Sequence, residues 1–314
     1  MRYIFNKINI GFLKFIKHPL QGYYFRKKAG LTNDDIMPLH SYHYLGLVAI
    51  FRGEDDYLIE WIEFHKLIGV EHFVLYDNGI SQASLNLLKK YIDDGLVTYI
   101  SFPHIKGLRD GRHAYTLNTQ QMAYADCIIR FRKHFKFLLH LDIDEFLFPK
   151  EEDSVINVLK SLNDKISRID VNWTNFGSDG KVKKPNGLVI ENFTKACSTI
   201  DPNGQKCIVA TKYLSKIFKY SNVHKFCIKY SLLDICKRIL FGYPIVIKGK
   251  EANKLLQLNH YITKSKEEFL SRSKIYKDGW QVGKKTLERF KYLDQNYNEV
   301  VNDNIKRFIP KLHT

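Results

Sequence analysis

Apolar residues in the first half of the chain alternate between the spacing of strands and the spacing of helices. Residues 45–51 (LGLVAIF) form a continuous apolar run of strand length, and the next segment places Leu58, Trp61 and Ile62 on one helical face until Gly69 ends it. The alternation continues through a predicted strand at 72–76, turn at 77–79, helix at 82–92, strand at 96–102, helix at 112–133 and strand at 136–141. Short connections between such elements predict a mainly parallel sheet with helices on both faces.

The pattern weakens after residue 150. A predicted helix at 154–163 and a strand near 166–174 are followed by Gly- and Lys-rich loops, and no repeat or low-complexity linker marks a domain boundary. We therefore expect an α/β fold whose parts are a basic amphipathic N-terminal extension over 1–40, a main domain over 41–290 and a C-terminal tail over 291–314.

The formal net charge of +16 is concentrated in two segments. Residues 1–30 hold seven Lys and Arg and no acid, and residues 205–250 hold ten, with Asp234 as the one acid. Both segments also carry apolar residues at helical spacing, namely Phe5, Ile8, Phe12 and Ile16 in the first and Ile228, Leu232, Ile235 and Ile239 in the second. This combination predicts contact with an anionic membrane surface. A solvated basic face over an ordinary core stripe is the alternative interpretation.

The sequence argues against a nucleic-acid partner, a membrane span and secretion. The sequence contains no zinc finger, RNP-like aromatic motif or convincing helix-turn-helix, so no nucleic-acid partner is expected. No apolar run is long enough to span a bilayer and the N-terminus lacks a secretory signal, so we predict a cytoplasmic protein that is peripheral at the inner face of the membrane. The cysteines form no C-x-x-C pair, which predicts reduced thiols.

The strongest chemical signal comes directly after the most apolar strand, in residues 141–146 (LDIDEF). Residues two apart in an extended segment project to the same side, so Asp142 and Asp144 can face one cation while Ile143 packs inward. Ligands of open α/β sheets bind beyond the carboxyl ends of the strands. Two carboxylates there suit Mg²⁺ or Mn²⁺ when a diphosphate supplies further oxygens. A pair of solvated loop acids is the alternative, and the apolar flanks FLLHL and FLF argue against it.

Two other functional classes compete with this interpretation. An aspartate-nucleophile phosphatase also carries D-x-D after an apolar strand, but it continues to Ser or Thr at the position that Phe146 occupies here. A basic binding protein for anionic lipid or nucleic acid, without catalysis, remains the alternative of a different kind. Metal-dependent nucleotide binding distinguishes the enzyme from the binding protein.

Four segments together carry a resemblance to a known family. They are VAIFRGEDDYLIEWIEFHKLIGVEHFVLYDNGIS, HLDIDEFLFP, WTNFGSDG and LNHYITKS, in this order. Over residues 44–277 the chain resembles bacterial family-2-like glycosyltransferases, which are relatives of glycosyltransferase family 92. The resemblance implies a GT-A (Rossmann-like) fold, a nucleotide-sugar donor such as a UDP-sugar, a divalent metal, and a glycan or lipid-linked glycan acceptor of the cell surface, such as lipopolysaccharide or capsule.

The same resemblance implies roles for individual residues. Arg52 and Glu54 match the segment that meets the nucleotide base, and the turn of Asp77 and Asn78 matches a second nucleotide contact. Asp77 has an alternative role, which is to stabilise its own turn. Further implied roles are diphosphate contact for Arg112 and Asp142, completion of the metal shell of Asp142 and Asp144 by His260, and phosphate contact for Lys264 and Ser265.

An inverting transferase needs a carboxylate that takes the proton of the acceptor hydroxyl. Glu145 and Asp179 are both available, and we expect Glu145 because relatives more often carry a small residue where Asp179 stands. Trp173 and Phe176 are candidates for stacking on a sugar, with core packing as the alternative. His224 is a second candidate metal ligand, ranked below His260.

Overall fold

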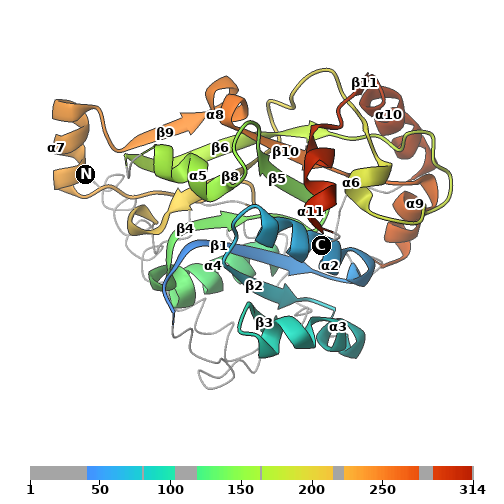
Figure 1. Cartoon of the computed structure of the whole chain (residues 1–314), viewed down its shortest axis with the longest axis horizontal. Helices are drawn as coiled ribbons and strands as arrows, with labels where there is room; N and C mark the ends of the chain where they lie inside the picture. The colour runs from blue at the N-terminus through green and yellow to red at the C-terminus, as the bar shows by residue number, and fades with distance from the viewer. Residues whose placement is uncertain are drawn as a thin grey trace, which may run out of the picture.

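The structure is a computed structural model, and it describes residues 41–79, 81–102, 119–162, 165–214, 223–275 and 286–312. The first part of the chain is built from alternating strands and helices (Figure 1): β1 (His43–Phe51), α2 (Asp55–Leu67), β2 (His72–Asp77), α3 (Gln82–Asp93), β3 (Val97–Ser101), α4 (Thr119–Phe131), η1 (Arg132–His134) and β4 (Phe135–His140). These elements follow the predicted order closely.

The second part of the chain is less regular. It contains β5 (Glu145–Pro149), α5 (Val155–Ser161), β6 (Ile166–Asn175), α6 (Val189–Asn192), β7 (Lys195–Ala196), β8 (Gln205–Ala210), η2 (Thr211–Tyr213), α7 (Leu232–Phe241), β9 (Ile245–Lys248), α8 (Lys250–Leu255), β10 (Leu256–His260), α9 (Lys266–Ile275), α10 (Leu287–Tyr297), β11 (Val300–Val301), η4 (Asn304–Phe308) and α11 (Ile309–Leu312).

One large sheet joins the two parts. Its strands follow the order β3-β2-β1-β4-β8-β6-β10-β5, and β9 pairs with β6. The pairs among β1, β2, β3 and β4 are parallel, as are those of β6 with β9 and β10, whereas β8 and β5 pair antiparallel with their neighbours. The prediction of an α/β fold with a mainly parallel sheet is confirmed.

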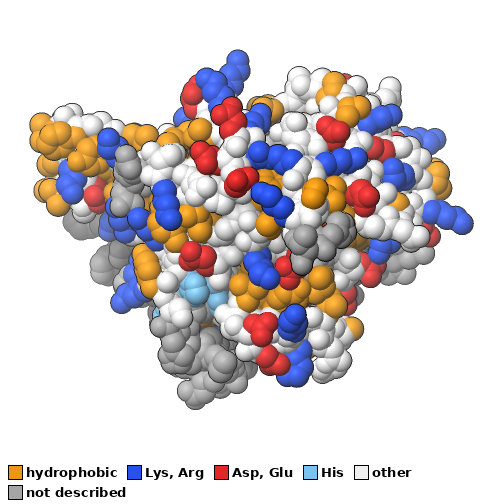
Figure 2. All heavy atoms as spheres, viewed as in Figure 1, with side chains coloured by type: hydrophobic (Ala, Val, Ile, Leu, Met, Phe, Trp, Pro, Cys, Tyr) orange, Lys and Arg blue, Asp and Glu red, His pale blue; other side chains and the backbone are white. Residues whose placement is uncertain are grey.

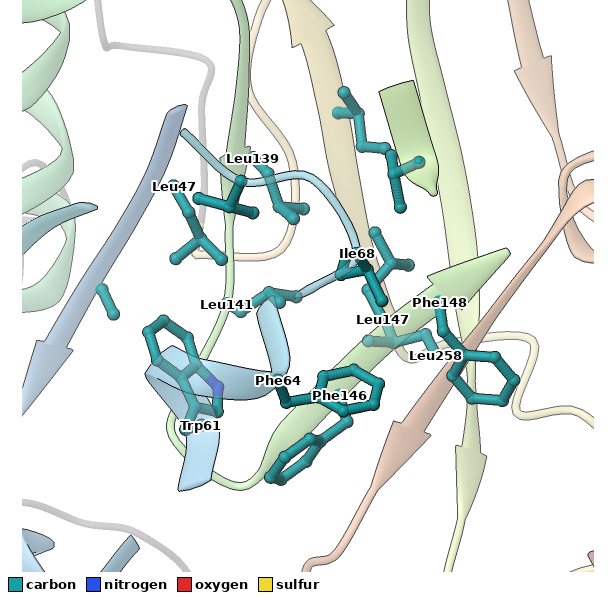
Figure 3. Packing of buried hydrophobic residues seen from close by; sticks show 14 of the residues in the cluster. Leu47, Trp61, Phe64, Ile68, Leu139, Leu141, Phe146, Leu147, Phe148 and Leu258 are labelled. Carbon is teal, nitrogen blue, oxygen red and sulfur yellow. The ribbon is translucent and has the colours of Figure 1, made fainter. Parts of the chain in front are cut away.

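The continuous apolar run of β1 is explained by burial on both faces of the sheet. Leu47 contributes to the cluster that contains Trp61 and Phe64 of α2, while its neighbour Val48 contributes to a second cluster with Tyr124 of α4. Figure 3 shows Trp61 and Phe64 directed toward Leu141, Phe146 and the central strands. The helix α2 therefore covers the segment from which the acidic motif emerges.

The C-terminal residues are part of the same core. The predicted boundary at residue 290 falls inside α10, and Ile305 and Phe308 of η4 belong to the main hydrophobic cluster. Aromatic contacts join Phe308 to Phe64 and Phe148, with ring centroids 5.6 and 5.9 Å apart. The predicted extension at 1–40 lies outside the described residues.

The sequence did not predict the short strands of the second half, nor the helices α8, α9 and α10. β5, β8 and β10 are short, and each is buried in the sheet. No helix in the described ranges is long and apolar enough to cross a membrane.

Candidate active site

The acidic motif forms a tight turn between two strands of the sheet. β4 ends at His140, the turn runs through Asp142 and Asp144, and β5 begins at Glu145. The indole Nε1 of Trp61 donates to the carbonyl oxygens of Asp142 (3.1 Å) and Glu145 (2.9 Å). Because Trp61 is fully buried in the core, its indole fixes the backbone of the turn to α2.

Asp142 is held by side chains from two other elements. Its Oδ1 accepts from Nε2 of Gln120 at 2.7 Å, and its Oδ2 accepts from Nζ of Lys206 at 2.9 Å. The Asp142 side chain is 34% exposed, whereas that of Lys206 is 1% exposed. The buried ammonium therefore faces the one partly open carboxylate of the motif.

Asp144 faces a different pair of groups. Its Oδ2 accepts from Nη1 of Arg272 at 3.0 Å, and its Oδ1 lies 3.9 Å from Nε2 of His260. The other ring nitrogen of His260, Nδ1, lies 2.9 Å from Oδ1 of Asn175. Asn175 fixes the orientation of the imidazole, so Nε2 is presented to Asp144.

Glu145 lies behind the turn and is fully buried. Its Oε2 accepts from the backbone N–H of Asp142 at 2.8 Å and lies 3.4 Å from Nζ of Lys206. Its Oε1 has no hydrogen-bond partner among the described residues. Burial raises the pKa of Glu145, and the Lys206 ammonium opposes that shift.

Two further charged groups border Asp144. Burial raises the pKa of Glu54 to about 7, and the negative charge of Asp144 acts in the same direction. Burial lowers the pKa of Lys264 to about 7, and the neighbouring Arg272 guanidinium contributes to that shift. The Lys264 ammonium lies 3.2 Å from the centroid of the Tyr57 ring and has no hydrogen bond within the described part of the chain.

These side chains form one charged cluster, which we call the acid–base cluster. It consists of Glu54, Asp142, Asp144 and Glu145 with Lys206, Lys264, Arg272 and His260. Within the described ranges, no group of three or more His, Cys, Asp and Glu side chains is placed to hold a metal ion by itself. The pair Asp144 and His260 fits a cation that takes few protein ligands and completes its shell from a diphosphate and water.

Aromatic rings pack beside His260. The Trp173 ring packs on the His260 ring with centroids 4.3 Å apart, and the His224 ring meets Trp173 at 5.3 Å. Gly204 permits this arrangement, because a Cβ at that position would lie 1.8 Å from Cε3 of Trp173. Phe176 is fully buried and packs on Tyr261, so it belongs to the core.

The turn after β2 is built largely from its own contacts. The Asp77 carboxylate accepts from the backbone N–H groups of Gly79 (2.7 Å) and Ser81 (3.1 Å) and from the Tyr99 hydroxyl (2.7 Å). The Asn78 amide donates to the carbonyl of Phe102 at 2.8 Å. Both residues thus tie the carboxyl ends of neighbouring strands together, which is the turn-stabilising role that the sequence left open for Asp77.

Three remaining candidates have distinct places. Arg52 lies against the same turn, since its Cγ would be 3.6 Å from a Cβ on Gly79. Arg112 lies outside the described residues. The Asp179 carboxylate binds the segment that follows α6, because it accepts from the backbone N–H groups of Thr194 (2.9 Å) and Lys195 (2.8 Å).

The sequence did not single out Lys206, Arg272 or Gln120, which contact the two aspartates. Lys206 is the clearest signal in retrospect, because it interrupts the apolar strand β8 at a position that is 1% exposed. A lysine is rarely fully buried unless it is paired. Arg272 and Gln120 lie on helices among other polar residues, so no local pattern distinguishes them.

Comparison with protein families gives one match over most of the chain. Residues 48–238 match the family model described as glycosyltransferase family 92. This range contains the acidic motif and Lys206, and it ends before Arg272 and His260.

Curated relatives agree with that match. A glycosyltransferase family 92 protein of Oryza sativa subsp. japonica is 24% identical over 292 residues, which are 87% of this chain and 45% of the relative. A galactan beta-1,4-galactosyltransferase of Arabidopsis thaliana is 33% identical over 129 residues, which are 40% of this chain and 24% of the relative. The chain thus spans less than half the length of these relatives.

Solved structures show only distant likenesses. A mannosyltransferase from Pyrobaculum calidifontis, in complex with GDP-Man and Mn²⁺, aligns over 98% of this chain and 78% of its own, with 11% identity and a TM-score of 0.34. The S. aureus protein TarS in complex with UDP aligns over 57% of this chain and 52% of its own, with 11% identity and a TM-score of 0.32. Likenesses this distant do not indicate a function.

Proposed function

Because this chain belongs to glycosyltransferase family 92, we propose that it transfers a sugar from a UDP-sugar to a cell-surface glycan in a reaction that depends on Mn²⁺ or Mg²⁺. The observation that carries the proposal is the acid–base cluster at the end of β4. Its two aspartates approach separate partners: Lys206 contacts Asp142, while Arg272 and His260 contact Asp144. Such a cluster suits a ligand that brings both a cation and a diphosphate.

The charge of the cluster supports a diphosphate ligand. Lys264 is buried without a hydrogen bond among the described residues, and the Arg272 guanidinium is a charged neighbour of it. A buried donor without an acceptor is costly, and a phosphate oxygen satisfies it and binds a guanidinium well. We therefore assign Lys264 and Arg272 to the diphosphate of the donor, beside the cation.

Asp144 and His260 are the residues that would hold the cation. An imidazole ligand favours Mn²⁺ over Mg²⁺. A bound divalent cation neutralises charge that develops on the departing diphosphate. Asp142 belongs to the same site, and Lys206 balances its charge before the donor binds.

We assign the role of general base in an inverting transfer to Glu145. Burial raises its pKa, and its Oε1 has no hydrogen-bond partner among the described residues, which suits a carboxylate that accepts a proton. Glu54 has a pKa of about 7 and borders Asp144, so it is the natural comparison. If Glu145→Gln loses turnover and Glu54→Gln keeps it, Glu145 is the general base. If Glu54→Gln loses turnover and Glu145→Gln keeps it, the general base is Glu54.

The acceptor that we propose is a glycan of the cell surface, such as lipopolysaccharide or capsule, carried on a lipid. Two relatives are named galactan beta-1,4-galactosyltransferases, so UDP-galactose belongs in the first panel of donors.

The test is a thermal-shift screen of UDP-galactose, UDP-glucose, UDP-N-acetylglucosamine and GDP-mannose, with Mn²⁺ and with excess chelator. A donor at a hundred times its dissociation constant stabilises the protein by about 2.7 kcal/mol. We expect this shift for a UDP-sugar only with the metal, and its loss in Asp144→Asn. Asp56→Asn is the control, because Asp56 is an exposed carboxylate paired with Lys184. Equal shifts in chelator would contradict the proposal.

A further inference from the structure

The helix α7 is amphipathic and makes few contacts with the other described residues. None of its ten residues is buried. Figure 1 shows it at the left edge of the molecule, beyond the end of the sheet, and Figure 2 shows hydrophobic side chains gathered at that edge. The most exposed apolar residues of this helix are Leu232 (78%), Ile239 (78%), Leu240 (71%), Phe241 (65%) and Leu233 (63%).

The helix has its polar side toward the protein, which is the reverse of an ordinary surface helix. At 100° per residue, Leu232, Leu233, Ile239 and Leu240 share one face with Cys236, and all five are exposed. The half-buried positions are the charged residues Asp234 and Lys237. On the same polar side, the Arg238 guanidinium lies 5.6 Å from the centroid of the Tyr230 ring. The apolar face is therefore directed outward.

Local interactions fix the helix without any burial. The Ser231 hydroxyl accepts from the backbone N–H of Asp234, and the Asp234 carboxylate accepts from the backbone N–H of Ser231 at 2.9 Å. Gly242 ends the helix with a φ of 72°, in the left-handed region that glycine adopts easily. An outward apolar face on a capped helix is a feature that a covering partner explains.

The surroundings of α7 are basic. Residues 223–250 hold six Lys and Arg, and Asp234 is their only acid. Lys212 and Lys237 lie close enough to lower the pKa of Asp234, after the larger effect of its hydrogen bonds to Ser231. Phe241 stacks on Tyr243 with ring centroids 6.0 Å apart, and the Lys165 ammonium lies 6.0 Å from the centroid of the Tyr243 ring. Bases around an apolar face, with a tyrosine at the rim, match the composition of a lipid interface.

We propose that α7 inserts its apolar face into an anionic lipid bilayer and so docks the protein on a membrane surface. The size of the face favours lipid over a second copy of the chain. Ten residues give a helix about 15 Å long and 10 Å wide, on the order of 150 Å². A stable protein dimer needs about 800 Å² from each partner. A bilayer needs no matching surface, and its anionic headgroups complement the surrounding bases.

The segment that carries α7 also reaches the acid–base cluster. The carbonyl oxygen of Val223, at the start of this segment, lies 3.5 Å from Nζ of Lys206, which contacts Asp142. When α7 is docked on lipid, one chain segment therefore contacts both the lipid surface and Lys206 of the candidate site. The docking itself does not depend on sugar transfer, because the helix lies apart from the cluster.

The experiment measures binding of the full chain to vesicles of phosphatidylglycerol and phosphatidylcholine in equal parts, and to vesicles of phosphatidylcholine alone. We expect binding to the anionic vesicles at least about tenfold tighter than to the neutral ones. The variant Leu232→Ser/Ile239→Ser/Leu240→Ser should lose at least about tenfold in affinity for the anionic vesicles. The matched control is Val301→Ser, which changes a residue that is 68% exposed on β11 and should bind as the unmodified chain does.

An environment-sensitive dye on Cys236 separates insertion from general electrostatic binding. Cys236 is exposed on the apolar face, and Cys236→Ser reports labelling at other cysteines. A blue shift on anionic vesicles, absent in Cys236→Ser, supports insertion. Unchanged vesicle binding of the triple variant, a dye that stays in water, or a dimer that the triple variant dissolves would each overturn the proposal. No nucleotide sugar is present, so failure here is distinct from failure of the proposed function.

Discussion

Lys206 provides the sharpest test of how the acidic motif is balanced. The substitution Lys206→Met keeps an unbranched side chain of similar length and removes the ammonium that lies 2.9 Å from Asp142 and 3.4 Å from Glu145. Removal of one partner of a buried pair costs about 3–5 kcal/mol, because the other charge stays buried. Asp142 is 34% exposed and is screened by water, so the cost falls mainly on the fully buried Glu145. We expect a loss of about 3 kcal/mol.

The loss should depend on pH and on Glu145. Without the ammonium, burial raises the pKa of Glu145 further, so the folded variant holds a proton that the unfolded chain releases. Stability of the variant should therefore fall as pH rises, and its deficit should be largest at alkaline pH. In Lys206→Met/Glu145→Gln both charges are absent, and the coupling energy between the two sites should reach about 2 kcal/mol.

Urea unfolding followed by circular dichroism measures all four members of this cycle. A loss of about 3 kcal/mol also lowers the melting temperature by roughly 4–6 °C for a chain of this size. Lys184→Met is the control: its exposed pair with Asp56 should contribute less than about 1 kcal/mol. Effects of Lys206→Met and Glu145→Gln that simply add, to within about 0.5 kcal/mol, would refute the reasoning.

Three further substitutions test the supports of the site. Trp61→Phe keeps an aromatic ring but removes the N–H that donates to two carbonyls of the motif turn. The free energy of unfolding in urea should fall by about 1–3 kcal/mol and turnover should fall as well. Unchanged turnover contradicts this role. Gly204→Ala should displace Trp173 from His260, seen as altered tryptophan fluorescence and a lower melting temperature, and an unchanged spectrum contradicts it. Burial lowers the pKa of His65 to about 3, so the unfolded chain binds a proton first as the pH falls. The wild type should therefore lose about 1.6 kcal/mol of stability between pH 6.5 and pH 5 from this group. Urea unfolding of His65→Gln should lack that loss, and equal slopes contradict it.

The first half of the fold could be predicted because β1, β2 and β4 are largely apolar segments that are buried on both faces of the sheet. The apolar run that ends at Phe51 predicts a strand, and the helical spacing around Trp61 predicts a helix. The structure places them in β1 and α2. The second half lacks such periods. β8 and β10 contain polar residues that are buried through specific partners, as Lys206 and Asn259 are, so burial in these strands does not follow hydrophobicity.

The same distinction applies to the candidate site. Asp142 and Asp144 could be predicted from local spacing at a strand end, and their partners could not. Arg272 lies 128 residues from Asp144 along the chain, and only the folded sheet brings the two together. Asp179 shows the converse, since a carboxylate in a glycine-rich loop serves to bind the backbone of Thr194 and Lys195.

Calorimetric titration of UDP into the protein, with Mn²⁺ and with excess chelator, tests the central claim most directly. The account predicts saturable binding with Mn²⁺, at least about tenfold weaker binding in chelator, and loss of that difference in Asp144→Asn. Binding of equal strength in chelator, or an Asp144→Asn variant that keeps the full metal dependence, would contradict it.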